Sequence, residues 1–175
     1  PEQLSEKLSI GGFEVESLVD TSLKFKGVVL GKVLSAEKHN NSDKLSICKV
    51  DIGIQQLQII CGASNVRSDI YVYVATIGSY LEKIDLTIKA SEIRGEHSRG
   101  MICSLEELGL EEKSNGIAII ENSIAQSYEL GTPISELLNL NDYIYELAIT
   151  ANRPDGMSMI GIAREVSALL QTKLT

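Results

Sequence analysis

Three cysteines and two histidines are the side chains here that could act as nucleophiles or bind a transition metal: Cys48, Cys61, Cys103, His39 and His97. The cysteines lie far apart without a C-x-x-C pair, whereas a zinc site needs clustered ligands. A Cys–His pair can be drawn from several of these residues, but no acid stands out that would orient the histidine. The sequence also contains neither a G-x-x-x-x-G-K-[ST] phosphate loop nor a G-x-S-x-G elbow. We therefore predict no catalytic residue and no metal site, and expect buried, reduced thiols.

Two groups of polar and basic residues have the chemistry of an RNA-binding surface. The first lies around a polar turn, where lysines could contact phosphates while amide and hydroxyl groups bond to sugar or base edges. It comprises Lys38, His39, Asn40, Ser42 and Lys44. The alternative is that Asn, Ser and Asp are present simply to make the turn.

The second group lies about fifty residues further along the chain. It comprises Arg94, Ser98, Arg99 and Met101. Gly95 and Gly100 would let the backbone bend and approach a ligand there. Alternatively, the glycines serve barrel closure and Arg94 pairs with Glu92 or Glu96. We favour the structural role for the glycines and leave the role of the arginines open.

Charge and aromatic content both weaken the case for RNA binding. The chain has 16 basic and 24 acidic residues, a formal net charge of −8, but most of the excess acidity lies outside the middle segment. Electrostatic attraction to phosphates would still be weak, because few phosphates could be neutralised. Base stacking needs aromatic platforms, and the middle segment offers Tyr71, Tyr73 and Tyr80 but no Trp.

The middle of the chain has the pattern of a small β-barrel. Five runs of strand-like residues, separated by Gly, Asn and Ser, predict short strands rather than an alternating α/β sheet. These runs are 28–36, 44–52, 56–61, 70–77 and 84–93. A further strand is expected at 116–120, followed by a short helix at 134–138 with Thr132 as its N-cap and Pro133 at its first position.

The two ends of the chain each carry part of a second unit. We predict helices at 1–12 and 158–171, and strands at 13–16 and 143–150. The predicted fold is mainly β with α+β elements, a barrel inserted into a small discontinuous α+β domain. The expected boundaries are 1–26 and 141–175 for that domain and 27–140 for the barrel with its extension. Because the chain starts at Pro1 without Met, we expect it to be a piece of a longer protein.

Three stretches resemble the signature of tRNA-binding OB-fold domains: 37–45 (EKHNNSDKL), 61–65 (CGASN) and 94–101 (RGEHSRGM). Asn40 stands where that family usually has Pro, and Arg99 where it often has an uncharged residue. The resemblance adds Asn65 to the candidate RNA-binding residues. The flanks 4–16 (LSEKLSIGGFEVE) and 150–169 (TANRPDGMSMIGIAREVSAL) are similar to the two halves of the first domain of bacterial phenylalanyl-tRNA synthetase β subunits. The chain is thus identified as a member of that family, from its N-terminal region.

The resemblance implies a cytoplasmic α2β2 enzyme that uses ATP and Mg²⁺ to charge its tRNA with phenylalanine. Its aminoacylation site belongs to the α subunit, and its editing and metal sites lie elsewhere in the β chain. For this segment it implies an auxiliary tRNA-binding OB module without a catalytic site, a cofactor or a membrane contact. The alternative is a structural module between domains that makes no RNA contact. A free-standing tRNA-binding dimer is a third interpretation, which the flanking halves oppose.

Overall fold

The computed structural model, which describes residues 1–174, contains two compact units. The barrel unit spans Ser22–Leu140, and the end unit combines Pro1–Thr21 with the chain from Asn141 onward. The fold is mainly β with a few helices, so the predicted fold class is confirmed.

Five strands form the main sheet of the barrel unit, in the order β10-β5-β2-β3-β4. Strand β11 also pairs with β5, at Tyr71 and Val72, whereas β10 pairs with Val74 and Ala75. All neighbouring pairs are antiparallel. Alternate residues face a common interior, as expected for strands buried on one face. The bounds are β2 (Val28–His39), β3 (Ser42–Asp51), β4 (Gln56–Cys61), β5 (Ile70–Ala75), β10 (Met101–Ile102) and β11 (Ile119–Ile120).

The segment just before β10 closes this sheet into a barrel. The Arg99 N–H donates to the Gln58 carbonyl over 2.9 Å. The Ser98 hydroxyl accepts the Ile60 N–H over 3.1 Å and donates to the Gly100 carbonyl over 3.1 Å. The edge of β4 that faces away from β3 is therefore bonded here rather than left open to other chains.

The barrel unit has two hydrophobic cores. One fills the barrel, where Val33, Val50, Ile59 and Val72 are fully buried. The other covers the outer side of β2 and β5, where the helices α2 (Asn122–Ala125) and α3 (Ile134–Leu137) pack. Strands β2 and β5 are consequently covered on both faces, which makes them the most deeply buried part of the unit.

The long connection from β5 to β10 differs from the prediction. Instead of one strand over 84–93 it holds the 3-10 turn η2 (Glu82–Ile84), a β6–β7 hairpin and a β8–β9 hairpin. Asp85 adopts a left-handed backbone (φ +48°), which ends any extended run at that point. Ile84 and Leu86 are exposed and Ile88 is buried, so the apolar alternation there does not mark one strand face. The hairpin strands are β6 (Tyr80–Leu81), β7 (Leu86–Thr87), β8 (Ser91–Ile93) and β9 (Glu96–Ser98).

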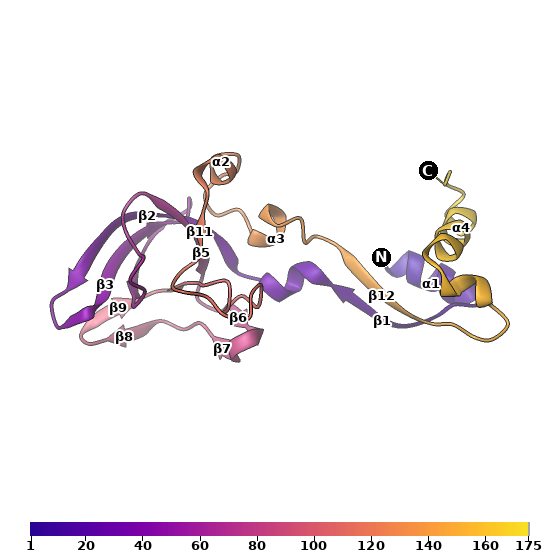
Figure 1. Cartoon of the computed structure of the whole chain (residues 1–175), viewed down its shortest axis with the longest axis horizontal. Coiled ribbons are helices and arrows are strands. Elements are labelled where there is room, and N and C mark those ends of the chain that lie inside the picture. The colour runs from indigo at the N-terminus through magenta and orange to yellow at the C-terminus, as the bar shows by residue number, and fades with distance from the viewer. Residues whose placement is uncertain (175) are drawn as a thin grey trace. The chain divides into compact units, whose positions relative to one another are not determined.

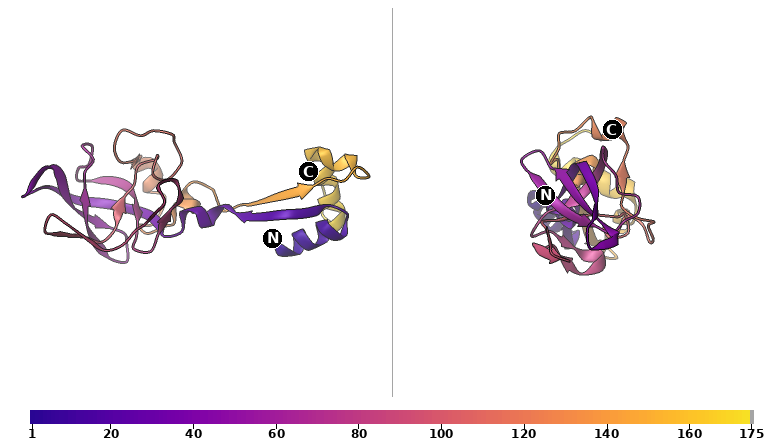
Figure 2. Two further views of the ribbon diagram at one scale, coloured as in Figure 1. Left: turned by 90° about the horizontal axis from the view of Figure 1, so that it is seen from below. Right: turned by 90° about the vertical axis from the view of Figure 1, so that its left-hand side faces the viewer.

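The end unit brings together the two ends of the chain. Strands β1 (Glu14–Asp20) and β12 (Tyr143–Ala148) pair antiparallel and run side by side in Figure 2. Helix α1 (Glu2–Ile10) packs against β1 and against α4 (Met159–Leu170).

Arg153 joins the parts of the end unit. Its guanidinium donates to the Gly11 carbonyl, forms ion pairs with Asp155 and Glu165 at 3.0 and 2.8 Å, and lies 4.1 Å from the Phe13 ring centroid. It comes just before the 3-10 turn η3 (Pro154–Met157). The turn that follows Arg153 therefore has a structural role in the end unit. The hydrogen bond from Arg153, together with its positive charge, lowers the pKa of Asp155 below its usual range.

Helices α4 and α3 begin in different ways, and the predicted N-cap of α3 is wrong. Ser158 caps α4, since its hydroxyl accepts the Gly161 N–H over 3.1 Å. Pro133, rather than Thr132, is the N-cap of α3 and makes no side-chain cap bond. The Thr132 hydroxyl instead donates backwards to the Glu129 carbonyl over 2.7 Å, so it stabilises the preceding turn. The 3-10 turn η1 (Thr21–Phe25) precedes β2.

Gly31, in the middle of β2, provides a test of the barrel packing. A Cβ built there would lie 2.6 Å from Val74 Cγ2, whereas one at Gly62 would meet nothing nearer than 3.6 Å. We expect Gly31→Ala to lower the free energy of unfolding by about 1–3 kcal/mol, because a packed neighbour must move. Gly62→Ala is the matched control and should change stability little. Urea unfolding of both variants measures this, and equal stabilities would contradict the packing.

Candidate nucleic-acid interface

The first candidate group lies at the tip of the β2–β3 hairpin. Strand β2 runs on to His39 and β3 begins at Ser42, so the turn is shorter than predicted and consists of Asn40 and Asn41. An irregularity in the register falls between Lys38 and His39. The side chains of Lys38, Asn40 and Lys44 are exposed at this tip, and Ser42 is half-buried.

The second group lies on and after the β8–β9 hairpin. Arg94 and Gly95 form its two-residue turn, both with positive φ (+53° and +91°), as in the turns that suit the twist of such hairpins. Arg94 and Arg99 are exposed. No ion pair of Arg94 with Glu92 or Glu96 occurs among the described residues, so the pairing considered as an alternative is not observed.

Contacts between the two tips join them into one surface, here called the hairpin surface. The Arg94 guanidinium donates to the Asn41 carbonyl over 3.1 Å. His39 is only 5% exposed, and its Nδ1 accepts the Asn41 N–H over 3.0 Å while its Nε2 lies 3.4 Å from the Ile93 carbonyl. The tautomer with its proton on Nε2 satisfies both contacts. His39 therefore shapes the turn and holds the second hairpin beside it.

Three more of the predicted residues are engaged within the fold. Ser98 is 3% exposed and closes the barrel. Asn65 holds the buried Ile117 at both backbone groups, donating to its carbonyl over 2.9 Å and accepting its N–H over 3.0 Å. Met101 is half-buried against the outer core. The predicted residues whose side chains are exposed are Lys38, Asn40, Lys44, Arg94 and Arg99.

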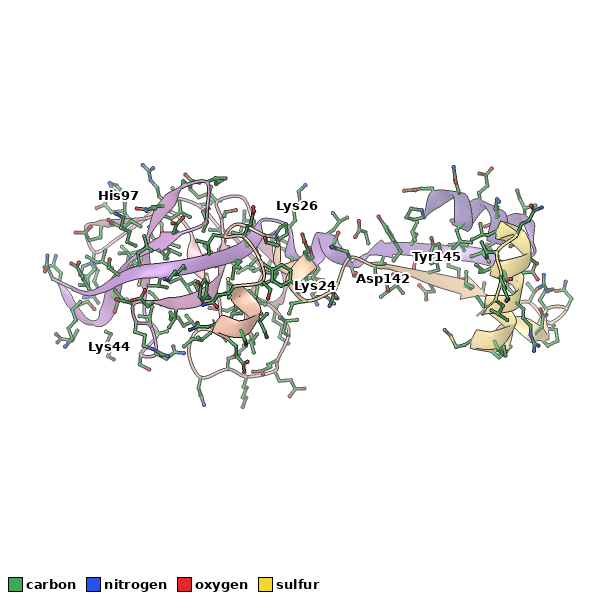
Figure 3. All side chains as sticks on the ribbon, turned by 90° about the horizontal axis from the view of Figure 1, so that it is seen from above. Lys24, Lys26, Lys44, His97, Asp142 and Tyr145 are labelled. Atoms are coloured by element: carbon green, nitrogen blue, oxygen red, sulfur yellow. The ribbon has the colours of Figure 1, made fainter. Side chains whose placement is uncertain are left out.

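The structure adds His97 and Gln58 as neighbours of this surface, neither of which was predicted to bind RNA. His97 is exposed on β9, and Figure 3 shows it at the same end of the barrel unit as Lys44, with Lys24 and Lys26 at the other end. Gln58 joins β4 to this hairpin, because its amide donates to the Glu96 carboxylate and the His97 carbonyl. The alternation around buried Ser98 could have marked His97 as outward-facing, but nothing local predicts the role of Gln58.

The hairpin surface is nearly balanced in charge and lacks a stacking platform. Exposed Glu37, Asp43 and Glu92 lie in the same segments as its four cations. Tyr73 is 8% exposed and belongs to the outer core, while Tyr71 lies under the Lys32 ammonium. Contact with RNA through this surface would thus depend on shape and a few charged bonds.

A family model described as "Putative tRNA binding domain" matches residues 28–129 of this chain. The matched range covers more than half of the sequence and contains both hairpins. The chain belongs to this tRNA-binding-domain family.

Curated relatives match over nearly the whole chain. It is 72% identical, over 98% of its length, to the phenylalanine–tRNA ligase beta subunit of Prochlorococcus marinus subsp. pastoris. It is 56% identical, over 99% of its length, to the same subunit of Synechococcus sp. (strain CC9902). The match occupies 21% and 22% of those proteins, so the chain spans about a fifth of the length of the relatives. The family resemblance stated from the sequence is confirmed.

Solved structures give weaker matches. The C-terminal domain of Plasmodium vivax p43 aligns with a TM-score of 0.35 at 25% identity, over 43% of each chain. The MetRS related protein from Pyrococcus horikoshii aligns with a TM-score of 0.44 at 18% identity, over 61% of this chain and 86% of that one.

The possible metal ligands of residues 1–174 do not gather in one place. Within that range, no group of three or more His, Cys, Asp or Glu side chains could hold a metal ion. All three cysteines are free and buried, as predicted. Burial raises the pKa of both the Cys48 and Cys103 thiols to about 12. No helix in the described part of the chain is long and apolar enough to cross a membrane.

The Asn65 bridge can be tested by stability. Asn65→Ala would leave the backbone N–H and carbonyl of buried Ile117 without these partners, so we expect it to cost about 1–3 kcal/mol of unfolding free energy. The exposed Asn115 serves as the control, and Asn115→Ala should cost little. Thermal and urea unfolding would measure both, and equal stabilities would contradict a structural role for Asn65.

The burial of the thiols predicts that they react slowly with thiol reagents in the folded protein. A thiol whose pKa is raised to about 12 holds little reactive thiolate at pH 8, and burial blocks access as well. With Ellman's reagent at pH 8 we expect hardly any reaction in the native protein and all three cysteines to react in 8 M urea. Fast native labelling of Cys48 or Cys103 would contradict their burial.

Proposed function

We propose that this chain is the tRNA-binding module of a phenylalanine–tRNA ligase β subunit, and that its hairpin surface contacts the tRNA backbone. The observation that carries the proposal is the junction of the two hairpins. It brings the exposed Lys38 and Lys44 to one place with Arg94 and Arg99, within the range matched by the tRNA-binding family.

We propose that the predicted RNA-binding residues divide into those that contact RNA and those that support the surface. Lys38, Lys44, Arg94 and Arg99 bind phosphates, and Asn40 bonds to sugar or base edges. His39, Ser42, Asn65, Ser98 and Met101 support this surface by shaping the turn, closing the barrel and packing the core.

The whole protein that we propose would act as an α2β2 ligase in the cytoplasm, using ATP and Mg²⁺ to join phenylalanine to its tRNA. The identity to beta subunits of phenylalanine–tRNA ligases over nearly the full chain supports this assignment. The described residues do not fit a metal site, so we place ATP and Mg²⁺ outside this segment. The contribution of the segment is then to raise the effective concentration of tRNA near the enzyme.

The second candidate function is a structural module between domains, without RNA contact. The near balance of charge on the hairpin surface and the burial of Tyr73 favour it. Both candidate functions require the same fold. Only substitution of the exposed Lys and Arg residues can therefore distinguish them.

The test is tRNA binding by the complete ligase carrying Lys38→Ala and Lys44→Ala. We expect weaker binding and a salt dependence, log K against log[salt], that is shallower by about 2, because two phosphate contacts are lost. The matched control is Lys24→Ala with Lys26→Ala, two exposed lysines at the other end of the barrel unit. Unchanged affinity and slope in both double variants would overturn tRNA contact and support the structural module.

A further inference from the structure

The end unit has an unusually small apolar interior. Among its described residues, the large side chains that are almost fully buried are Leu8 and Phe13, at 2% and 0% exposure. The barrel unit, by contrast, contains two complete clusters. A two-stranded sheet is marginally stable unless helices or further strands cover it. The end unit is therefore held largely by polar contacts such as those of Arg153, and it buries little apolar area by itself.

A patch of apolar side chains remains exposed where α4 begins. Met157, Met159 and Ile160 are 77%, 88% and 56% exposed although they follow one another closely in the chain. The first turn of α4, which carries two of these residues, has no acidic residue. Clustered apolar residues of this kind mark interaction sites rather than ordinary surface.

The strand pair shows a second uncovered region in the same unit. Val19 and Ile144 are direct cross-strand partners and are 50% and 58% exposed. Because side chains alternate along a strand, these two lie on the face opposite Leu18 and Tyr145, whose hydroxyl donates to the Pro1 carbonyl. The end unit thus exposes apolar residues on two separate elements.

We infer that Met157, Met159 and Ile160 are the docking surface for the remainder of a longer polypeptide, an apolar protein surface in the same chain. The inference depends on the proposed function, in which the chain is one part of a ligase β subunit. In the relatives, about four-fifths of the polypeptide lies outside the matched region, which supplies a covering surface in cis. Unbranched methionines adapt well to such a contact, and the first turn of α4 carries no acidic residue that the contact would have to bury.

Methionine oxidation in the full-length β subunit is the first measurement. Exposed methionines oxidise faster than covered ones, so each peptide is compared with the same peptide in the urea-unfolded protein. We expect Met157 and Met159 to oxidise at least about tenfold more slowly in the native full-length protein, as packed side chains do. Rates near those of the unfolded protein would show that the patch stays exposed and would overturn the inference.

A photocrosslinker then identifies what covers the patch. Benzoylphenylalanine replaces Met159 in the full-length subunit and, as a matched control, Ile54, which is 89% exposed in the barrel unit. We expect Met159→benzoylphenylalanine to form crosslinks within one chain to residues outside this segment, and the control to form few. Crosslinks only to the barrel unit, to a second copy, to the α subunit or to tRNA would each overturn the inference.

These readouts are independent of tRNA affinity. If the lysine variants leave tRNA binding unchanged while Met159 crosslinks in cis, tRNA contact fails and the docking surface stands. If the lysine variants weaken binding while Met157 and Met159 oxidise freely, tRNA contact stands and the docking surface fails.

Discussion

Closure of the barrel by the segment Ser98–Gly100 is the constraint on which the rest of the barrel unit depends. Its bonds to Gln58 and Ile60 fix the free edge of β4. They also fix where the preceding β8–β9 hairpin must lie, since that hairpin ends at Ser98. Once it is held there, Arg94 reaches the Asn41 carbonyl and the two tips form one surface. A change of Ser98 would therefore alter the proposed RNA contact, although Ser98 itself carries no charge.

The signature residues of the tRNA-binding domain divide by burial. His39, Asn65 and Ser98 use their polar groups on the backbone of other segments. Such bonds are costly to lose when the partner is buried. These residue types are therefore needed for the fold whether or not RNA binds. Whether the domain binds RNA therefore depends on the exposed Lys and Arg residues. Nearby acidic residues almost balance their charge, which limits the nonspecific attraction to RNA phosphates.

Much of the fold follows from local pattern. Strand β4 has the bounds predicted from its strand-like run, and α4 begins one residue after the start predicted at 158. The region around Ile84–Ile93 was not predictable in this way, because Asp85 breaks an alternating run by adopting a left-handed backbone. The candidate surface was only partly predictable for a related reason. Residue type marks His39 and Ser98 as polar, but their burial depends on contacts more than thirty residues away in the chain.

Hydrogen–deuterium exchange of the full-length protein, with and without tRNA, tests the central claim most directly. The claim is that the two hairpin tips act as one tRNA-binding surface. It predicts that tRNA slows amide exchange together at residues 38–44 and 92–99, and leaves the loop at 111–115 unchanged. Slowed exchange at one tip alone, or at neither tip while tRNA is bound elsewhere on the protein, would contradict it.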